Sequence, residues 1–157
     1  MTEFSEPSEQ NSYLVEHINL LRESFRYRLG RDLIDASVTP VEAAKQLYAA
    51  PFVLVSHDTA AEPIFNYGNQ TAQRLFEMSW QELTTLPSRQ SAEPPNQEER
   101  AQLLTTVSAQ GFIENYAGIR ISKNNKRFRI EQVTVWNLDR NGVYLGQAAV
   151  YSQWTYL

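Results

Sequence analysis

Three runs rich in β-branched and aromatic residues end the sequence, and the short links between them constrain the fold more than any other feature. The runs cover residues 112–122, 127–138 and 143–154. Their links, KNNK and DRNG, have the length and composition of tight turns, and Asn141-Gly142 is a strong hairpin signal. Strands joined by tight turns pair in an antiparallel manner. We therefore predict a three-stranded antiparallel meander.

Helices and two further strands precede the meander. An apolar stripe at helical spacing, from Leu14 to Leu29, predicts a helix over residues 13–29. Thr39 and Pro40 are typical of the N-cap and first position of a second helix, which Pro51 ends. Two short runs, residues 52–56 and 64–67, predict strands.

A second helical region lies between these strands and the meander. Asn69 stands where an N-cap is expected, and helices are predicted from there to about residue 86. The paired prolines of SAEPPNQ predict a loop, and residues 98–110 predict a helix that ends before Gly111. This order of elements predicts an α+β fold with one antiparallel sheet.

The composition is that of one ordinary globular domain. The 157 residues carry a net charge of −4, which gives generic nucleic-acid binding no support. No apolar run is long enough to span a bilayer, so we expect no membrane insertion. The acidic, polar start is the opposite of a secretory signal, which favours a cytoplasmic location. We expect residues 1–11 to be disordered, residues 12–50 to form a helical segment and residues 51–157 to form the main domain.

Alternation along the meander predicts an unusual polar cluster. If Asn124-Asn125 and Asn141-Gly142 are the turn centres, one sheet face is apolar at its edges and polar at its middle. The polar residues are Asn115, Gln132, Thr134 and Gln147, beside the small Ala117 and Ala149. A buried amide without a partner costs about 1–3 kcal/mol. Two interpretations follow: a network satisfied by its own side chains or by buried water, or a ligand pocket with convergent polar groups.

The opposite face of the predicted meander carries more apolar surface than water tolerates. Its apolar residues include Val133, Val135, Val150 and Trp154. The helix over residues 13–29 adds a stripe of its own, and together these surfaces exceed what one helix covers. We therefore predict a homodimer that shares this face with the N-terminal helix.

Two stretches after the second predicted strand resemble PAS domains. NQTAQRLF, residues 69–76, followed by WQEL, residues 80–83, is similar to the Asn-x-x-x-x-x-Leu-x and x-x-Glu-Leu pattern of that fold. More narrowly, PFVLVSHDTAAEPIFNYGN, LPSR, GIRISKNNKRFRIEQVTVWNL and GQAAVYSQW resemble the MEKHLA domain, a PAS-related family. The resemblance covers roughly residues 44–154 and is closer to bacterial stand-alone versions than to plant homeodomain–leucine-zipper regulators. No homeodomain or zipper is present in these residues, so no DNA binding is carried over.

The resemblance implies a PAS-like five-stranded antiparallel sheet, with inserted helices that arch over a pocket, and a sensory or interaction function. It makes Tyr67, Phe76, Trp80 and Trp136 candidates for the core or the pocket wall. His57 is either a strand-end residue or a ligand contact. Arg89, at the implied pocket rim, either anchors its loop or clamps a ligand carboxylate.

The sequence does not identify a cofactor. Some PAS domains carry haem on a helical histidine or a cysteine-bound flavin, and the resemblance favours neither type here. The helix over residues 98–110 has no histidine, and the chain has no cysteine. A small organic ligand held without a covalent bond remains open.

The leading functional hypothesis is a sensory domain that binds such a ligand and signals through dimer or partner contacts. A small α+β enzyme with His57 or a pocket carboxylate as base, and a purely structural dimerisation module, are the alternatives. The predicted pocket offers amides and a hydroxyl rather than acid–base groups, which favours binding over catalysis. We predict no catalytic residue, and with only His17 and His57 as histidines we predict no metal site.

Overall fold

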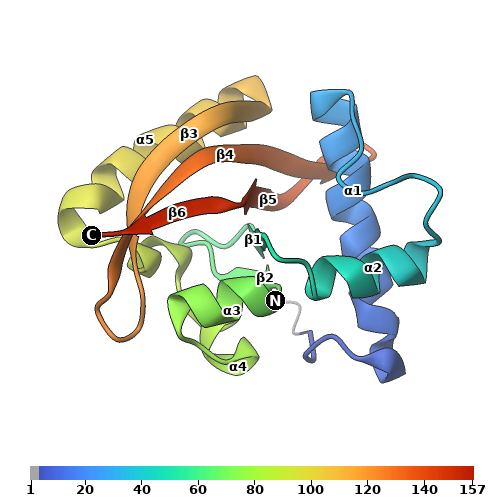
Figure 1. The fold of residues 1–157 in the computed structure, drawn as a ribbon. Helices are drawn as coiled ribbons and strands as arrows, with labels where there is room; N and C mark the ends of the chain where they lie inside the picture. Colours follow the sequence, from blue (N-terminus) through green and yellow to red (C-terminus); the bar gives the residue numbers. More distant parts are fainter. Residues whose placement is uncertain (1–3) are drawn as a thin grey trace.

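Six antiparallel strands form one sheet in the computed structural model, which describes residues 4–157 (Figure 1). The strand order is β2-β1-β5-β4-β3, and β6 pairs with β4. The strands are β1 (Val53–His57), β2 (Phe65–Gly68), β3 (Phe112–Ile121), β4 (Arg127–Arg140), β5 (Val143–Tyr151) and β6 (Gln153–Tyr156). The helices are η1 (Glu9–Leu14), α1 (Val15–Leu29), α2 (Pro40–Tyr48), α3 (Gln70–Phe76), α4 (Trp80–Leu83), η2 (Ser88–Ser91) and α5 (Pro94–Gln110), η1 and η2 being 3-10 helices.

The predicted α+β class and the position of the last long strand are confirmed. Strand β5 lies between β1 and β4, so β1 is not at an edge of the sheet. The strand predicted over residues 143–154 is divided at Ser152 into β5 and β6, and β6 continues along β4 in the register of Thr134–Leu138 with β5. The sheet predicted with five strands therefore has six.

Helices α1 and α2 cover one face of the sheet, which we call the outer face (Figure 1). Ile18, Leu21 and Phe25 of α1 pack there against Trp136 and Leu138 of β4. The indole of Trp136 donates a hydrogen bond of 3.2 Å to the carbonyl oxygen of Leu21 and stands edge-on to the ring of Phe25. The N-terminal helices thus share a hydrophobic cluster with the sheet. Within residues 4–157, no helix has both the length and the apolar composition needed to cross a membrane.

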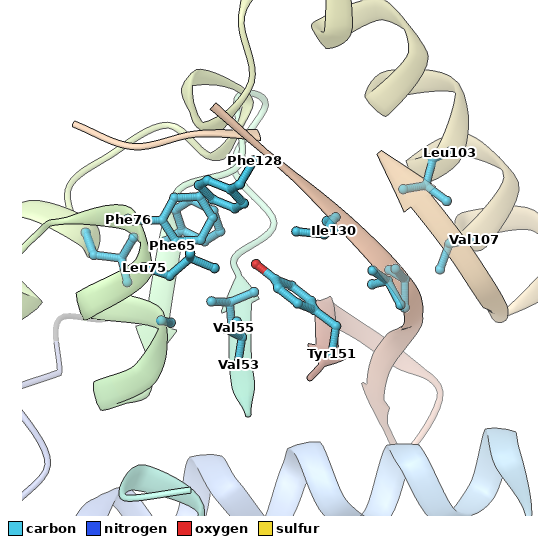
Figure 2. Packing of buried hydrophobic residues seen from close by; sticks show 14 residues of the cluster. Val53, Val55, Phe65, Leu75, Phe76, Leu103, Val107, Phe128, Ile130 and Tyr151 are labelled. Carbon is cyan, nitrogen blue, oxygen red and sulfur yellow. The ribbon is translucent and has the colours of Figure 1, made fainter. Parts of the chain in front are cut away.

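Helices α3 and α5 cover the opposite face, which we call the inner face. The apolar cluster there is drawn in Figure 2, where the rings of Phe65, Phe76 and Phe128 lie together. Tyr151 projects from β5 between Val55 and Ile130, with its hydroxyl toward the middle of the cluster.

Asn69 joins the two strands to the inserted helices, as its predicted N-cap role requires. Its Oδ1 accepts hydrogen bonds from the backbone N–H groups of Ala72 and Leu54, and its Nδ2 donates to the carbonyl oxygens of Leu47 and Phe52. The side chain is fully buried. It therefore fixes α3 against β1 and the end of α2.

The segment before η1 departs from the expected disorder. The carbonyl oxygen of Phe4 accepts a hydrogen bond of 3.0 Å from the indole of Trp80, and the carboxylate of Glu6 accepts one of 2.8 Å from the hydroxyl of Tyr48. A polar composition predicted disorder over residues 1–11, but these two hydrogen bonds and the contact of the Phe4 ring with His17 hold this segment against the domain. The expectation for residues 1–3 lies outside the described residues.

Two other sequence-based expectations require correction. The helix predicted over residues 98–110 begins earlier, at Pro94, because the first turn of a helix tolerates residues without an N–H group. The predicted strand register is also wrong. Asn115, Gln132 and Gly146 have positive φ angles of 57°, 53° and 132°, and each marks a shift in pairing.

Each such bulge adds one residue to a strand and moves the side chains beyond it to the other face. Thr134 therefore pairs with Val150 rather than Ala149, and Trp136 pairs with Ala148 rather than Gln147. Thr134 and Trp136 belong to the outer face. Val133 and Val135, predicted on the outer face, belong to the inner face.

Candidate functional site

A cavity of about 60 Å³ lies between the inner face of the sheet and α5. About 10–15 Å³ of such space holds one water molecule, so the cavity has room for a few waters or for a small organic group. Its walls are mostly apolar and come from β1, β2, β4, β5, α3 and α5. They include Val55, Phe65, Phe76, Leu103, Leu104, Ile130, Val133, Val135, Ala149 and Tyr151. Polar groups also reach it, from His57, Ser91, Arg100, Tyr116, Arg120 and Gln147.

Helix α5 brings an arginine to the cavity on its apolar side. Arg100 lies three and four positions before Leu103 and Leu104, and seven before Val107. Residues at this spacing share one face of a helix. The face that buries the leucines therefore also buries Arg100, which is 8% exposed.

The bulge at Asn115 brings a tyrosine and a second arginine to the same cavity. Beyond the bulge, Tyr116, Gly118 and Arg120 of β3 pair with inward-facing residues of β4. Arg120 is 6% exposed and donates a hydrogen bond of 3.1 Å to the hydroxyl of Tyr116. That hydroxyl donates one of 2.8 Å to Glu99 of α5. A Cβ atom at Gly118 would clash with the Tyr116 hydroxyl, so glycine is required for this arrangement.

Neither buried guanidinium has a carboxylate partner among residues 4–157. Arg120 donates only to the hydroxyl of Tyr116 and to the carbonyl oxygen of Ile119, and Arg100 makes no hydrogen bond to that part of the chain. Burial, and then the charge of Arg120, lower the pKa of Arg100 to about 10, against weaker opposing effects of Tyr116 and Glu99. Arginine is rarely buried without a partner. The cavity therefore holds positive charge that no direct ion pair within the described residues neutralises.

His57 ends β1 at the edge of the same cavity. Its Nδ1 lies 3.0 Å from the carbonyl oxygen of Asp58, so Nδ1 carries the proton of the neutral ring. Its Nε2 is buried without a hydrogen-bond partner. Burial lowers the pKa of His57, and the charge of Arg100 adds to this effect, while Asp58 and the amide of Gln147 oppose it. The ring is therefore held neutral and presents a free acceptor.

Gln147 lies opposite His57 on β5 and is held by protein groups. Its Nε2 donates to Asn137 Oδ1 at 3.0 Å and reaches Ser108 Oγ and the Leu104 carbonyl oxygen at 3.2 Å. It fixes the end of α5 to the sheet beside the cavity.

The structure brings three of the ten sequence-predicted site residues to the cavity: His57, Phe76 and Gln147. Asn115 and Gln132 are exposed at the bulges, and Thr134 and Trp136 are buried on the outer face. Tyr67 and Trp80 are core residues of the cluster beneath α1 and α2. Arg89 is half exposed and forms a 2.8 Å ion pair with Glu62, as a loop anchor would. The predicted polar floor therefore does not form.

Sequence reasoning missed Arg100, Tyr116 and Arg120. The signal for Arg100 was its place on the stripe of Leu103, Leu104 and Val107, which extends the buried face by one turn. Asn115 carried the signal for the other two, because asparagine is among the residues that tolerate a left-handed backbone inside a strand.

The sequence profile of the MEKHLA domain matches residues 15–156, from the first residue of α1 to the last of β6. No curated protein sequence matches the chain. Among solved structures, a PAS domain from Colwellia psychrerythraea is 16% identical with a TM-score of 0.62, over 74% of this chain and 94% of that one.

Two further solved structures give the same result. A light-oxygen-voltage domain studied with a flavin analogue is 15% identical, with a TM-score of 0.58 over 74% of this chain and 84% of that one. A PAS domain of a two-component sensor histidine kinase is 12% identical, with a TM-score of 0.56 over 74% and 94% of the two chains. At these identities the likeness shows the fold, and it confirms the predicted PAS-like architecture.

Proposed function

The chain belongs to the MEKHLA domain family, and from this premise we propose that it is a PAS-like sensory domain that binds a small organic ligand in the cavity under α5. The observation that carries the proposal is that buried polar groups without protein partners face an otherwise apolar cavity. Among the described residues, His57 Nε2 is such an atom, and the buried Arg100 forms no hydrogen bond or ion pair. A core that served packing alone would not need them, because each unsatisfied buried group costs free energy.

The proposal also includes a route from the cavity to the N-terminal helix. The carbonyl oxygen of Gly111, the residue that ends α5, accepts a hydrogen bond of 2.9 Å from the backbone of Asn137. The side chain of Arg28 in α1 lies against Gly111 and forms a 2.5 Å ion pair with Asp139. A ligand that shifts α5 therefore acts directly on the end of α1. We propose α1 as the output element, in a cytoplasmic protein.

Self-association is a secondary proposal, because the structure leaves less apolar surface exposed than the sequence indicated. Val133 and Val135 line the cavity instead of the outer face, and the stripe of α1 is packed on Trp136. The large apolar side chains that are exposed are Tyr27, Val41, Val143, Tyr144, Leu145, Tyr156 and Leu157. Sedimentation over a range of concentrations measures this directly, and a chain that stays monomeric at every concentration contradicts it.

No specific observation favours the enzyme alternative. His57 could act as a base, but in residues 4–157 the groups around it are Arg100, Gln147 and the carbonyl oxygen of Asp58, which suit recognition of a ligand. The structural-module alternative predicts a cavity that matters only for packing.

The experiment that separates these functions compares the wild-type chain with Ala149→Leu, which adds apolar volume inside the cavity. Native mass spectrometry of freshly purified protein should show a small molecule on the wild type that Ala149→Leu lacks. Ala117→Leu, on β3 and away from the cavity lining, is the matched control and should keep the molecule. If the wild type carries nothing and Ala149→Leu is simply more stable, the cavity is a packing defect and the sensory proposal fails.

A further inference from the structure

The two buried arginines indicate which chemical class of ligand the cavity takes, an inference that rests on the proposed function. Arg100 comes from α5 and Arg120 from β3, so two separate elements deliver positive charge to one cavity. Both side chains are more than nine-tenths buried. The other arginines with ion pairs, such as Arg28, Arg89 and Arg127, find their carboxylates within the chain.

We propose that Arg100 and Arg120 bind the carboxylate of a small organic acid whose apolar part fills the remainder of the cavity. The planar fork of a guanidinium matches the two oxygens of a carboxylate, and charge-assisted hydrogen bonds of this kind are strong in a desolvated site. The hydroxyl of Tyr116 lies beside Arg120 and keeps its guanidinium turned toward the cavity. The ligand would form the direct ion pair that residues 4–157 do not form with either arginine.

The lining favours a carboxylate over a phosphate. A phosphate presents more oxygens, each requiring a donor, and much of the cavity lining is apolar, as at Val133, Val135 and Leu103. A carboxylate needs only the two guanidiniums and leaves an apolar body for these walls. The volume of about 60 Å³ limits that body to a short branched chain, because a cavity that holds a benzene ring measures about 150 Å³.

His57 supplies a second point of recognition. Its Nε2 is an acceptor without a protein partner, and Arg100 is close enough to lower the pKa of the ring. An acid that also carries a hydroxyl group could donate to this atom while its carboxylate binds the arginines. The cavity therefore fits a hydroxylated acid at least as well as the plain acid.

The test uses the full chain and uncharged analogues of the same shape. Isothermal titration is done with isovalerate and isovaleramide, with benzoate and benzamide as a larger pair, and with inorganic phosphate, at one ionic strength set with chloride. We expect saturable binding of at least one acid and at least tenfold weaker binding of its amide. Arg100→Met and Arg120→Met should each weaken binding of the acid roughly 10- to 100-fold and leave binding of the amide unchanged. Arg129→Met, on the exposed side of β4, is the control and should change binding of neither the acid nor the amide.

A second readout separates ligand binding from a structural role of the arginines. Removing a buried charge without a partner should raise the melting temperature of the empty protein, whereas loss of a structural contact lowers it. If Arg100→Met does not fold, Arg120→Met and the wild-type comparison of acid with amide still decide the question.

The outcomes distinguish this inference from the function on which it rests. Amides that bind as well as the acids, or phosphate that binds more tightly than either acid, overturn the carboxylate assignment and leave a ligand-binding cavity. If none of the five probes binds and native mass spectrometry finds no small molecule, the proposed function fails, and this inference fails with it.

Discussion

Arg28 of α1 lies directly against Gly111, the residue that ends α5: a Cβ atom on Gly111 would stand 2.6 Å from Nη1 of Arg28. Helix α1, the proposed output element, and α5, which covers the cavity, therefore meet at one point. Gly111 also has a φ of 94°, which residues with a side chain rarely adopt.

Gly111→Ala should lower the free energy of unfolding by about 1–3 kcal/mol, because both the backbone and the Arg28 contact are strained. Gly30→Ala is the matched control, since Gly30 has a φ of 72° but a Cβ atom there would meet no other atom within 4 Å. Urea unfolding of both variants measures the difference. Equal losses would mean that the contact between α1 and α5 contributes nothing.

Asn69→Ala should be among the most destabilising single substitutions. It removes four hydrogen bonds at a fully buried position, two from backbone N–H groups and two to backbone carbonyl oxygens. We expect a loss of about 2–4 kcal/mol. Asn124→Ala, which removes one exposed hydrogen bond to Glu77, should lose less than about 0.5 kcal/mol in the same denaturant series. Comparable losses would contradict the assigned role of Asn69.

Stability should fall as the pH falls below neutrality. His17 lies between the rings of Phe4 and Tyr67, and its Nε2 is 2.9 Å from the hydroxyl of Ser56. Burial lowers the pKa of His17 from 6.5 to about 4. Below pH 6.5 the unfolded chain binds a proton that the folded chain refuses until about pH 4, so stability is lost across that window.

The loss from His17 should reach about 3 kcal/mol at the acid end of the window. His57, whose pKa burial also lowers, adds a loss in the same direction. His17→Gln should therefore flatten the pH profile of unfolding only in part, and His57 accounts for the remainder. A wild-type profile that is flat between pH 6.5 and 4 would show that neither histidine is held neutral.

The bulge at Gln132 decides which residues face the cavity, and it can be probed directly. Gln132 has a φ of 53°, so Gln132→Gly should match or exceed wild-type stability, and Gln132→Val should lose about 1–2 kcal/mol. Arg129→Val, at another exposed position of β4 without a positive φ, should be tolerated. The bulge is absent in solution if valine is accepted equally well at both positions.

The sequence was sufficient for the elements but not for the faces of the sheet. Asn69 and the Asn141-Gly142 turn carry strong local signals, and both are where they were expected. The bulges at Asn115 and Gln132 depend on pairing across the sheet, for which a single strand carries only a weak signal. Because one bulge in each strand was missed, Thr134 and Trp136 were expected on the face where Val133 and Val135 line the cavity.

Arg100 shows a different limit of sequence reasoning. A charge on an otherwise apolar helix face is normally read as the edge of the solvated side. Its burial follows from the position of β3, whose bulge turns Tyr116 and Arg120 toward α5. The candidate site thus depends on contacts between elements that are distant in sequence.

The most direct measurement of the central claim follows the side-chain N–H signals of the arginines by NMR during titration with isovalerate. Binding in the cavity should shift the Nε–Hε signals of Arg100 and Arg120 saturably, while the signal of the exposed Arg129 stays in place and isovaleramide has little effect. Assignment comes from the loss of one signal in Arg100→Met and of another in Arg120→Met. If isovalerate leaves both buried arginines unchanged, or moves all arginine signals alike, the cavity does not bind carboxylates.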